Sequence, residues 1–192
     1  GSFEVLPDKK EPICKDQKFA EMAPAKCATC TVVLVSPTLA ITAGHCLKAH
    51  SDDIEGYCEN LDIVFGFHKD RKIPAEKKTG CSKVLKWGSD ENEDFAVIRL
   101  DPPMSGEMAA SVDFGWTPTD GAQLANIGHS KGLPMVGTRG TIDRDDPARQ
   151  GPTVNGKASP ISFYHTMDTV GGHSGSPIFS TETGKLIGWN TT

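Results

Sequence analysis

The chain has 192 residues, of which 37% are hydrophobic, and its 25 acidic and 20 basic residues give a net charge of -5. Its apolar residues come in short runs, none of which approaches the roughly 20 apolar residues needed to cross a bilayer. The sequence also has no basic cluster that would neutralise a phosphate backbone. These properties argue against a membrane-spanning or nucleic-acid-binding protein and indicate a globular one.

Short apolar segments separated by turn residues follow one another along the first half of the chain. The clearest contains Leu61, Ile63, Phe65 and Phe67, which alternate with other residues at the period of two that is typical of a strand with one apolar face. We expect strands in the first half at 31–35, 39–42, 61–67, 84–87 and 95–100. Only a short helical turn after His45 is expected.

The second half repeats this pattern, with expected strands at 122–128, 136–142, 161–166, 177–180 and 186–189. Because 20 glycines and 13 prolines interrupt nearly every candidate helix, the sequence predicts an all-β fold, either a barrel or a sandwich. The Pro- and Gly-containing segment 101–106 is the best linker. It predicts one domain at 1–105 and a second at 106–192.

Six cysteines, an even number, lie in the first half, which predicts a disulfide framework there. They are Cys14, Cys27, Cys30, Cys46, Cys58 and Cys81. The segment 27–30 is a C-x-x-C motif, which could belong to a zinc site or a redox pair. No second C-x-x-C or H-x-x-x-H follows it, so the sequence does not favour a metal site.

Three short motifs carry residues suited to acyl transfer. Segment 171–177 reads GGHSGSP, whose paired glycines allow backbone amides to converge beside Ser174, where an oxyanion would form. His45, in TAGHC at 42–46, is a candidate base. Asp94 is a candidate acid, chosen over its acidic neighbours because the apolar run FAVI follows it directly. The order His, Asp, Ser is one of the known arrangements for this chemistry.

Four other histidines have no comparable sequence context. We therefore expect surface or local structural roles for His68, His129, His165 and His173.

In this order and at these separations, the three motifs resemble the chymotrypsin-type serine peptidases. GGHSGSP, together with IGHSKGLP at 127–134, is most similar to the bacterial trypsin-like and V8-like branch. The resemblance covers about residues 30–189. It implies two packed antiparallel six-stranded β-barrels with the active site between them, His45 and Asp94 in the first barrel, and Ser174 with the specificity pocket in the second.

The resemblance also implies a mechanism that needs no cofactor or metal ion. In it, His45 takes the proton of Ser174 and returns it to the leaving group, while Asp94 fixes the imidazole tautomer. The amides of Gly172 and Ser174 form the oxyanion hole. The implied function is that of a serine endopeptidase that works through an acyl-enzyme.

One disulfide follows from the same resemblance. In the family, a bridge with the spacing of Cys30 and Cys46 fastens the loop of the catalytic histidine. The other four cysteines allow three pairings. Cys14 with Cys27 and Cys58 with Cys81 need the least chain reorganisation.

Substrate choice is expected to depend on Asp168, six positions before Ser174. Trypsin-like enzymes hold there the carboxylate that pairs with Arg or Lys, so the resemblance implies cleavage after basic residues. The alternative role for Asp168 is to cap a local turn. V8-like cleavage after Glu would require a histidine on the strand that forms the pocket wall. Asn190 stands near that position, which disfavours this specificity.

Two departures from the family pattern bear on activation and partners. His173 replaces the aspartate that often precedes the nucleophile. Related enzymes continue past the position of Thr192 through strands that complete the second barrel. Three alternatives follow for the second barrel: a separate C-terminal segment completes it as a second partner, the sequence is cut short, or the barrel closes differently. The partner implied by the resemblance itself is a polypeptide substrate.

The implied location is secreted or periplasmic. Two alternatives to an endopeptidase stay open, a catalytically silent protease-like binding domain and an esterase that uses the same triad.

Overall fold

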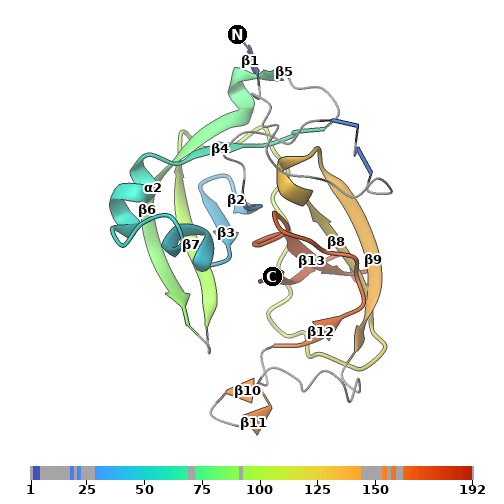
Figure 1. Ribbon diagram of the computed structural model, residues 1–192. Helices are drawn as coiled ribbons and strands as arrows, with labels where there is room; N and C mark the ends of the chain where they lie inside the picture. Colours follow the sequence, from blue (N-terminus) through green and yellow to red (C-terminus); the bar gives the residue numbers. More distant parts are fainter. Residues whose placement is uncertain are drawn as a thin grey trace.

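The computed structural model describes residues 2–4, 18–19, 21–22, 29–68, 72–90, 93–143, 153–154, 157–158 and 162–191. Its regular structure is nearly all β, and the two main antiparallel sheets curl into half-barrels that lie side by side (Figure 1). The predicted all-β fold with two antiparallel barrels is thus confirmed. Each of these sheets has five strands in the described part of the chain, where six were expected.

The first sheet contains the first half of the chain and has the strand order β2-β3-β7-β6-β4. Its strands are β2 (Val33–Ser36), β3 (Leu39–Thr42), β4 (Asp62–Val64), β6 (Lys78–Ser89) and β7 (Asp94–Asp101). Along β7, Ala96, Ile98 and Leu100 are buried and alternate with more exposed residues. Successive side chains of a strand point to opposite faces, so this alternation places one face of β7 in the core.

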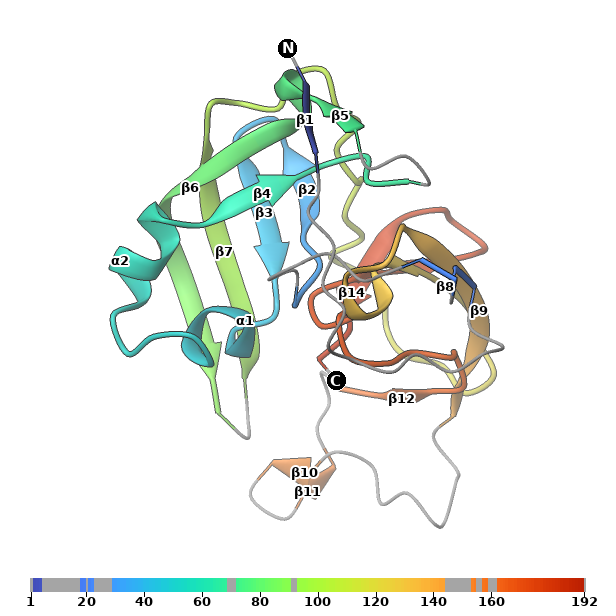
Figure 2. The ribbon, with the colours of Figure 1, turned by 45° about the horizontal axis from the view of Figure 1, so that its top comes forward.

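The second sheet contains the second half of the chain and has the order β12-β9-β8-β13-β14. Figure 2 labels its strands β8, β9, β12 and β14. Its strands are β8 (Gln123–Gly128), β9 (Val136–Asp143), β12 (Tyr164–His165), β13 (Pro177–Ser180) and β14 (Leu186–Trp189). A separate core forms here around Leu124, Ile142, Met167 and Ile178. The division into domains at 1–105 and 106–192 stays a prediction.

Short elements complete the structure. They are the paired strands β1 (Ser2–Glu4) and β5 (Lys72–Pro74), the paired strands β10 (Thr153–Val154) and β11 (Lys157–Ala158), the helices α1 (His45–Lys48) and α2 (Ile54–Glu59), and the 3-10 turns η1 (Ala75–Lys77) and η2 (Ser130–Gly132). None of the helices in the described ranges is long and apolar enough to cross a membrane.

Helix α2 was not predicted from the sequence. It has only six residues, too few for an apolar period of 3.6 to be recognised. The local signal is Asp53, whose side chain caps the helix by accepting a hydrogen bond from the Gly56 amide at 3.0 Å. Ile54 and Cys58 are buried and fix the helix on the first sheet.

The strand expected at 61–67 is shorter than predicted. Pairing with β6 stops at Val64, and Gly66 adopts a positive φ of 71°, a conformation that favours glycine. The chain therefore leaves the sheet. Phe67 is buried against Ile73 and stacks on His129, with ring centroids 5.8 Å apart.

Two disulfides stabilise the first half of the molecule. Cys30 is bonded to Cys46, and Cys58 is bonded to Cys81, which fastens α2 to β6. Both are pairings expected from the sequence. The remaining expected pair, Cys14 with Cys27, lies outside the described residues.

Removing the Cys58–Cys81 bridge tests its contribution to stability. The bridge closes a loop of 23 residues. Constraining a loop of this length in the unfolded chain stabilises the folded state by about 3 kcal/mol. We expect the double variant Cys58→Ala, Cys81→Ala to lose about that much in urea-induced unfolding followed by tryptophan fluorescence. A loss well below about 1 kcal/mol would show that the bridge does not constrain the unfolded chain.

Candidate active site

The position of His45 is fixed by the glycine that precedes it. At Gly44, a β-carbon would lie 1.8 Å from the carbonyl oxygen of Gly88 and 2.9 Å from that of Phe95, so no larger residue fits. The turn from β3 into α1 can therefore pass directly over β6 and β7. This close approach brings His45 to the start of β7, where Asp94 lies.

His45 and Asp94 form a two-point contact. The Nδ1 atom of His45 lies 2.7 Å from Oδ2 of Asp94, and the His45 amide donates to Oδ1 at 2.8 Å. Both carboxylate oxygens thus bind the same residue, which fixes the carboxylate plane and the imidazole orientation. The two side chains are 36% and 21% exposed, so the pair is partly accessible from solvent.

A tryptophan from the second sheet supports Asp94, a contact that the sequence did not predict. The indole Nε1 of Trp189, on β14, donates to the backbone oxygen of Asp94 at 2.9 Å. The Trp189 ring also lies 6.5 Å from the ring of Phe95. The start of β7 is therefore held from both halves of the molecule.

The turn that contains Ser174 packs against the segment that leads to His45. The carbonyl oxygen of Ser174 accepts a hydrogen bond from the Thr31 amide at 2.8 Å, and Ser174 is 5% exposed. Gly175 has a φ of 81°, and a β-carbon there would lie 2.2 Å from Thr42 Oγ1 and 3.0 Å from the Ala43 amide nitrogen. Ala43 is two residues before His45. The structure therefore brings the segments of all three predicted residues together.

The glycines before Ser174 also fit tightly. Gly172 has a φ of 97°, and a β-carbon there would lie 2.3 Å from the carbonyl oxygen of His129. The amide of Lys131 donates to the oxygen of Gly171 at 2.7 Å. The turn is thus held against the segment 128–131, which follows β8.

The two residues expected to choose the substrate differ in their surroundings. Asp168 is exposed. Asn190 is buried, its amide donates to the oxygen of Ser176 at 2.9 Å, and its side-chain Oδ1 lies 3.1 Å from Nε2 of His165. His165, on β12, was expected on the surface or in local structure. It is partly buried and contacts Asn190 instead.

Two other histidines are more buried than expected. His173 is fully buried, and burial is the main cause that lowers its pKa below the usual histidine range. Burial also lowers the pKa of His129, although a hydrogen bond to the Leu133 carbonyl opposes this shift. Both rings are therefore neutral at neutral pH. His68 is exposed, as expected.

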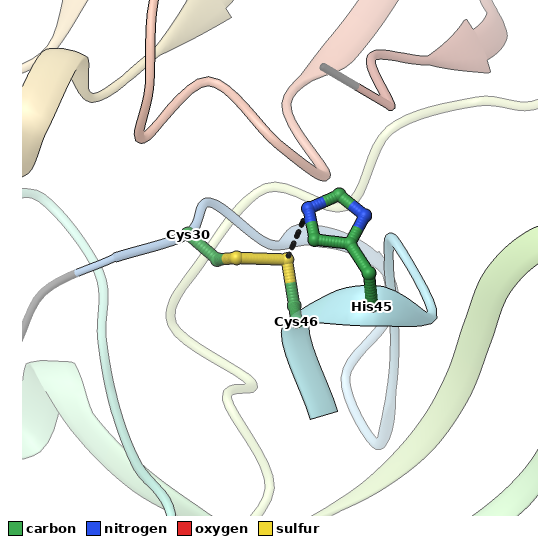
Figure 3. Close-up of side chains that lie close together, drawn as sticks. All are labelled: Cys30, His45 and Cys46. Carbon is green, nitrogen blue, oxygen red and sulfur yellow. Dashed lines mark hydrogen bonds between the residues drawn. A yellow bond between two sulfur atoms is a disulfide. The ribbon is translucent and has the colours of Figure 1, made fainter. Parts of the chain in front are cut away.

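The one group of three potential metal ligands in the described ranges is Cys30, His45 and Cys46 (Figure 3). The sulfur atoms of Cys30 and Cys46 are bonded to each other at 2.01 Å, so neither is a thiolate. Metal coordination by cysteine needs the thiolate form. These residues therefore do not fit a metal ion, and the zinc reading of the C-x-x-C motif would require breaking this bridge.

Residues 29–188 match the family described as Trypsin-like peptidase domain. The chain belongs to this family. This match confirms the family resemblance that the sequence motifs indicated. The chain is called the trypsin-like peptidase below.

Two curated bacterial proteins are similar to the trypsin-like peptidase. An "Extracellular metalloprotease" of Bacillus subtilis is 29% identical over 157 residues, which cover 78% of this chain and 45% of that protein. A "Glutamyl endopeptidase" of Bacillus licheniformis is 27% identical over 154 residues, or 79% of this chain and 45% of that protein. The chain thus spans under half the length of these relatives.

Solved structures show the same fold. A Glu endopeptidase in complex with MPD has a TM-score of 0.64 at 18% identity, covering 85% of this chain and 73% of that chain. An inactive form of Rv3671c from M. tuberculosis has a TM-score of 0.52 at 19% identity, covering 83% and 69% of the two chains.

Replacing Trp189 tests the contact between the two halves. Trp189→Phe keeps an aromatic ring but loses the donor to the Asp94 carbonyl, so we expect a loss of about 1 to 2 kcal/mol in unfolding free energy. The matched control is Trp87→Phe on β6, where the side chain is 40% exposed. That variant should stay within about 0.5 kcal/mol of the parent chain. Equal losses in the two variants would contradict the assigned role.

Proposed function

We propose that this trypsin-like peptidase is a serine endopeptidase in which Ser174 is the nucleophile, His45 the general base and Asp94 the orienting acid. The observation that carries the proposal is the junction between the two halves. The bidentate contact of Asp94 with His45 lies beside the segment on which the Ser174 turn is packed. An imidazole oriented by a carboxylate and a serine in a glycine-rich turn are groups that nucleophilic acyl transfer requires.

The proposed reaction follows from the roles of these atoms. Ser174 Oγ attacks the substrate carbonyl carbon as its proton passes to Nε2 of His45, because Nδ1 is held by Asp94. The same proton then goes to the leaving amine as the peptide bond breaks, which leaves an acyl-enzyme. Water, deprotonated by His45, attacks the acyl group and restores Ser174.

The amides of Gly172 and Ser174 are proposed to bind the oxyanion that forms during attack. The turn that carries these amides is fixed by the backbone bonds of its other members, since the amides of His173, Gly175 and Ser176 each donate to a carbonyl oxygen of the protein. Removing one oxyanion donor lowers the rate of such enzymes about 10²- to 10³-fold.

We propose that Asp168 directs cleavage to bonds after Arg or Lys. Its exposed carboxylate lies on the segment that leads into the Ser174 turn, where a substrate guanidinium can form a bidentate pair. The buried side chain of Asn190 is proposed to shape the same pocket. Because one relative is named a glutamyl endopeptidase, cleavage after Glu is the competing outcome. In that case His165, which lies beside Asn190, would bind the carboxylate of the substrate glutamate.

The substrate class that fits a peptidase family is a polypeptide. A separate C-terminal segment remains a predicted second partner.

A secreted or periplasmic location is also proposed. It is supported by the two disulfides, which persist in oxidising compartments. The name of the extracellular relative agrees with it.

Labelling with a fluorophosphonate probe tests the proposed triad. We expect covalent labelling of the parent chain at Ser174, mapped by peptide mass spectrometry, and none in Ser174→Ala. Asp94→Asn should label about 10⁴-fold more slowly, because the imidazole tautomer is no longer fixed. The control Asp101→Asn, at the other end of β7, should label at the parent rate. A folded parent chain that is not labelled would favour a silent binding domain.

Profiling cleavage of a peptide library tests the specificity and separates an endopeptidase from an esterase. We expect cleavage after Arg and Lys in the parent chain. Asp168→Ser should lower hydrolysis after Arg by about 10²-fold or more, because the site loses a charged partner, while fluorophosphonate labelling persists. Glu182→Ser removes an exposed charge elsewhere in the same half and should change neither reading. Cleavage after Glu, or loss of labelling in Asp168→Ser, would contradict the role of Asp168.

A further inference from the structure

His173 occupies a central place in the turn that is proposed to bind the oxyanion. It lies between Gly172 and Ser174, and its side chain is 1% exposed. Its backbone amide donates to the carbonyl oxygen of Val170 at 3.0 Å, and its own carbonyl accepts from Ser176 at 2.8 Å. Any movement of His173 therefore moves the two neighbouring amides.

The ring of His173 is anchored at one nitrogen. Nδ1 lies 3.1 Å from the carbonyl oxygen and 3.3 Å from the amide nitrogen of Val170, and 3.4 Å from Oγ of the buried Ser130. The ring edge packs on Gly128, where a β-carbon would lie 2.8 Å from Cδ2 of His173. The ring thus joins the turn to the segment that follows β8.

The other ring nitrogen, Nε2, is buried and has no hydrogen-bond partner among the described residues. In the neutral ring with its proton on Nδ1, the Val170 carbonyl accepts and Nε2 carries only a lone pair. The protonated ring would have an N–H at Nε2 that points into a site without an acceptor. An unsatisfied buried donor costs about 1 to 3 kcal/mol, and more when the group is charged.

The charged and titratable groups around the ring do not remove this cost. Asp168 favours the protonated ring, and His165 on β12 opposes it. His129 lies on the facing segment, and the His173 ring is one of the groups that lower the pKa of His129. Burial is the largest influence and lowers the pKa of His173 below 6.5, the ordinary histidine value, so the ring is neutral at neutral pH.

We propose that His173 is a positioning residue whose neutral ring holds the amides of Gly172 and Ser174 toward the oxyanion, and that protonation of the ring releases the turn and inactivates the enzyme. This inference rests on the proposed function. The protonated ring must reach water or an acceptor, and it can do so only by leaving the packed position between Val170, Ser130 and Gly128. The turn would then act as an acid-sensitive switch, separate from protonation of the general base.

The pH dependence of fluorophosphonate labelling tests the switch without knowledge of the substrate. If protonation of either His45 or His173 inactivates the enzyme, the logarithm of the second-order labelling rate constant should fall with a limiting slope of about two at acid pH. His173→Asn places an amide at the Nδ1 position and does not titrate. It should label at neutral pH within about tenfold of the parent rate and should show a limiting slope of about one.

Two further variants separate positioning from general packing. His173→Ala loses the anchor to Val170 and should label about 10²-fold more slowly at neutral pH, as expected when oxyanion donors are misplaced. His129→Asn removes a neighbouring partly buried histidine and should keep the slope of about two. Circular dichroism over the same pH range confirms that each variant stays folded while labelling is measured.

The pH dependence of the unfolding free energy tests independently whether His173 binds a proton more weakly in the folded state. Because burial lowers the pKa of His173 in the folded state, the unfolded chain binds the proton more readily. Stability should therefore fall as pH drops below about 6.5, the unfolded value. This loss should be smaller in His173→Asn than in the parent chain.

The outcomes distinguish this inference from the proposed function. A folded parent chain that is not labelled at Ser174 overturns the proposed function and this inference with it. Labelling at Ser174 with a limiting slope of about one in the parent chain overturns the switch alone. A limiting slope of about two that persists in His173→Asn also overturns the switch alone, because the second inactivating proton would then bind a group other than His173.

Discussion

The close packing of the 171–176 turn on the end of β3 is the constraint on which the rest of the structure depends. Gly175 carries no side chain, and this alone allows the turn to lie against Thr31, Thr42 and Ala43. Gly44 serves the same purpose one step further along the chain, where α1 passes over β6 and β7. The proposed nucleophile and base are thus joined through backbone contacts, which are less variable than contacts between long side chains.

Polar groups then orient the residues that this packing brings together. Asp94 is held by its two bonds to His45 and, through its backbone, by Trp189 from the other half. On the opposite side, the buried ring of His173 fastens the turn to Val170 and Ser130. The groups that make these contacts with Asp94 and with His173 are buried or half-buried. Removing the hydrogen-bond partner of such a group lowers the stability of the folded state. In the switch that we propose, the geometry of the site also depends on the protonation of the His173 ring.

Much of this arrangement is predictable from the sequence, because it depends on local patterns. The apolar run after Asp94 predicts a strand at 95–100, which the structure contains as β7. The family resemblance predicts the bridge between Cys30 and Cys46, and the least chain reorganisation favours Cys58 with Cys81 among the other pairings. Long-range contacts explain what was missed. The bond from Trp189 to Asp94 and the burial of His173 depend on chain segments that meet only in the folded molecule. The short helix α2 depends on the cap supplied by Asp53, and the strand expected at 61–67 ends at Val64, before the positive φ of Gly66 turns the chain away from the sheet.

The most direct test of the central claim is a crystal structure of the fluorophosphonate adduct of the parent chain. The claim predicts phosphorus bonded to Ser174 Oγ, a phosphoryl oxygen within hydrogen-bond distance of the amides of Gly172 and Ser174, and Nε2 of His45 on the side of the leaving group. An adduct on another residue would contradict it. So would an adduct on Ser174 whose phosphoryl oxygen points away from these amides, with the imidazole of His45 out of reach.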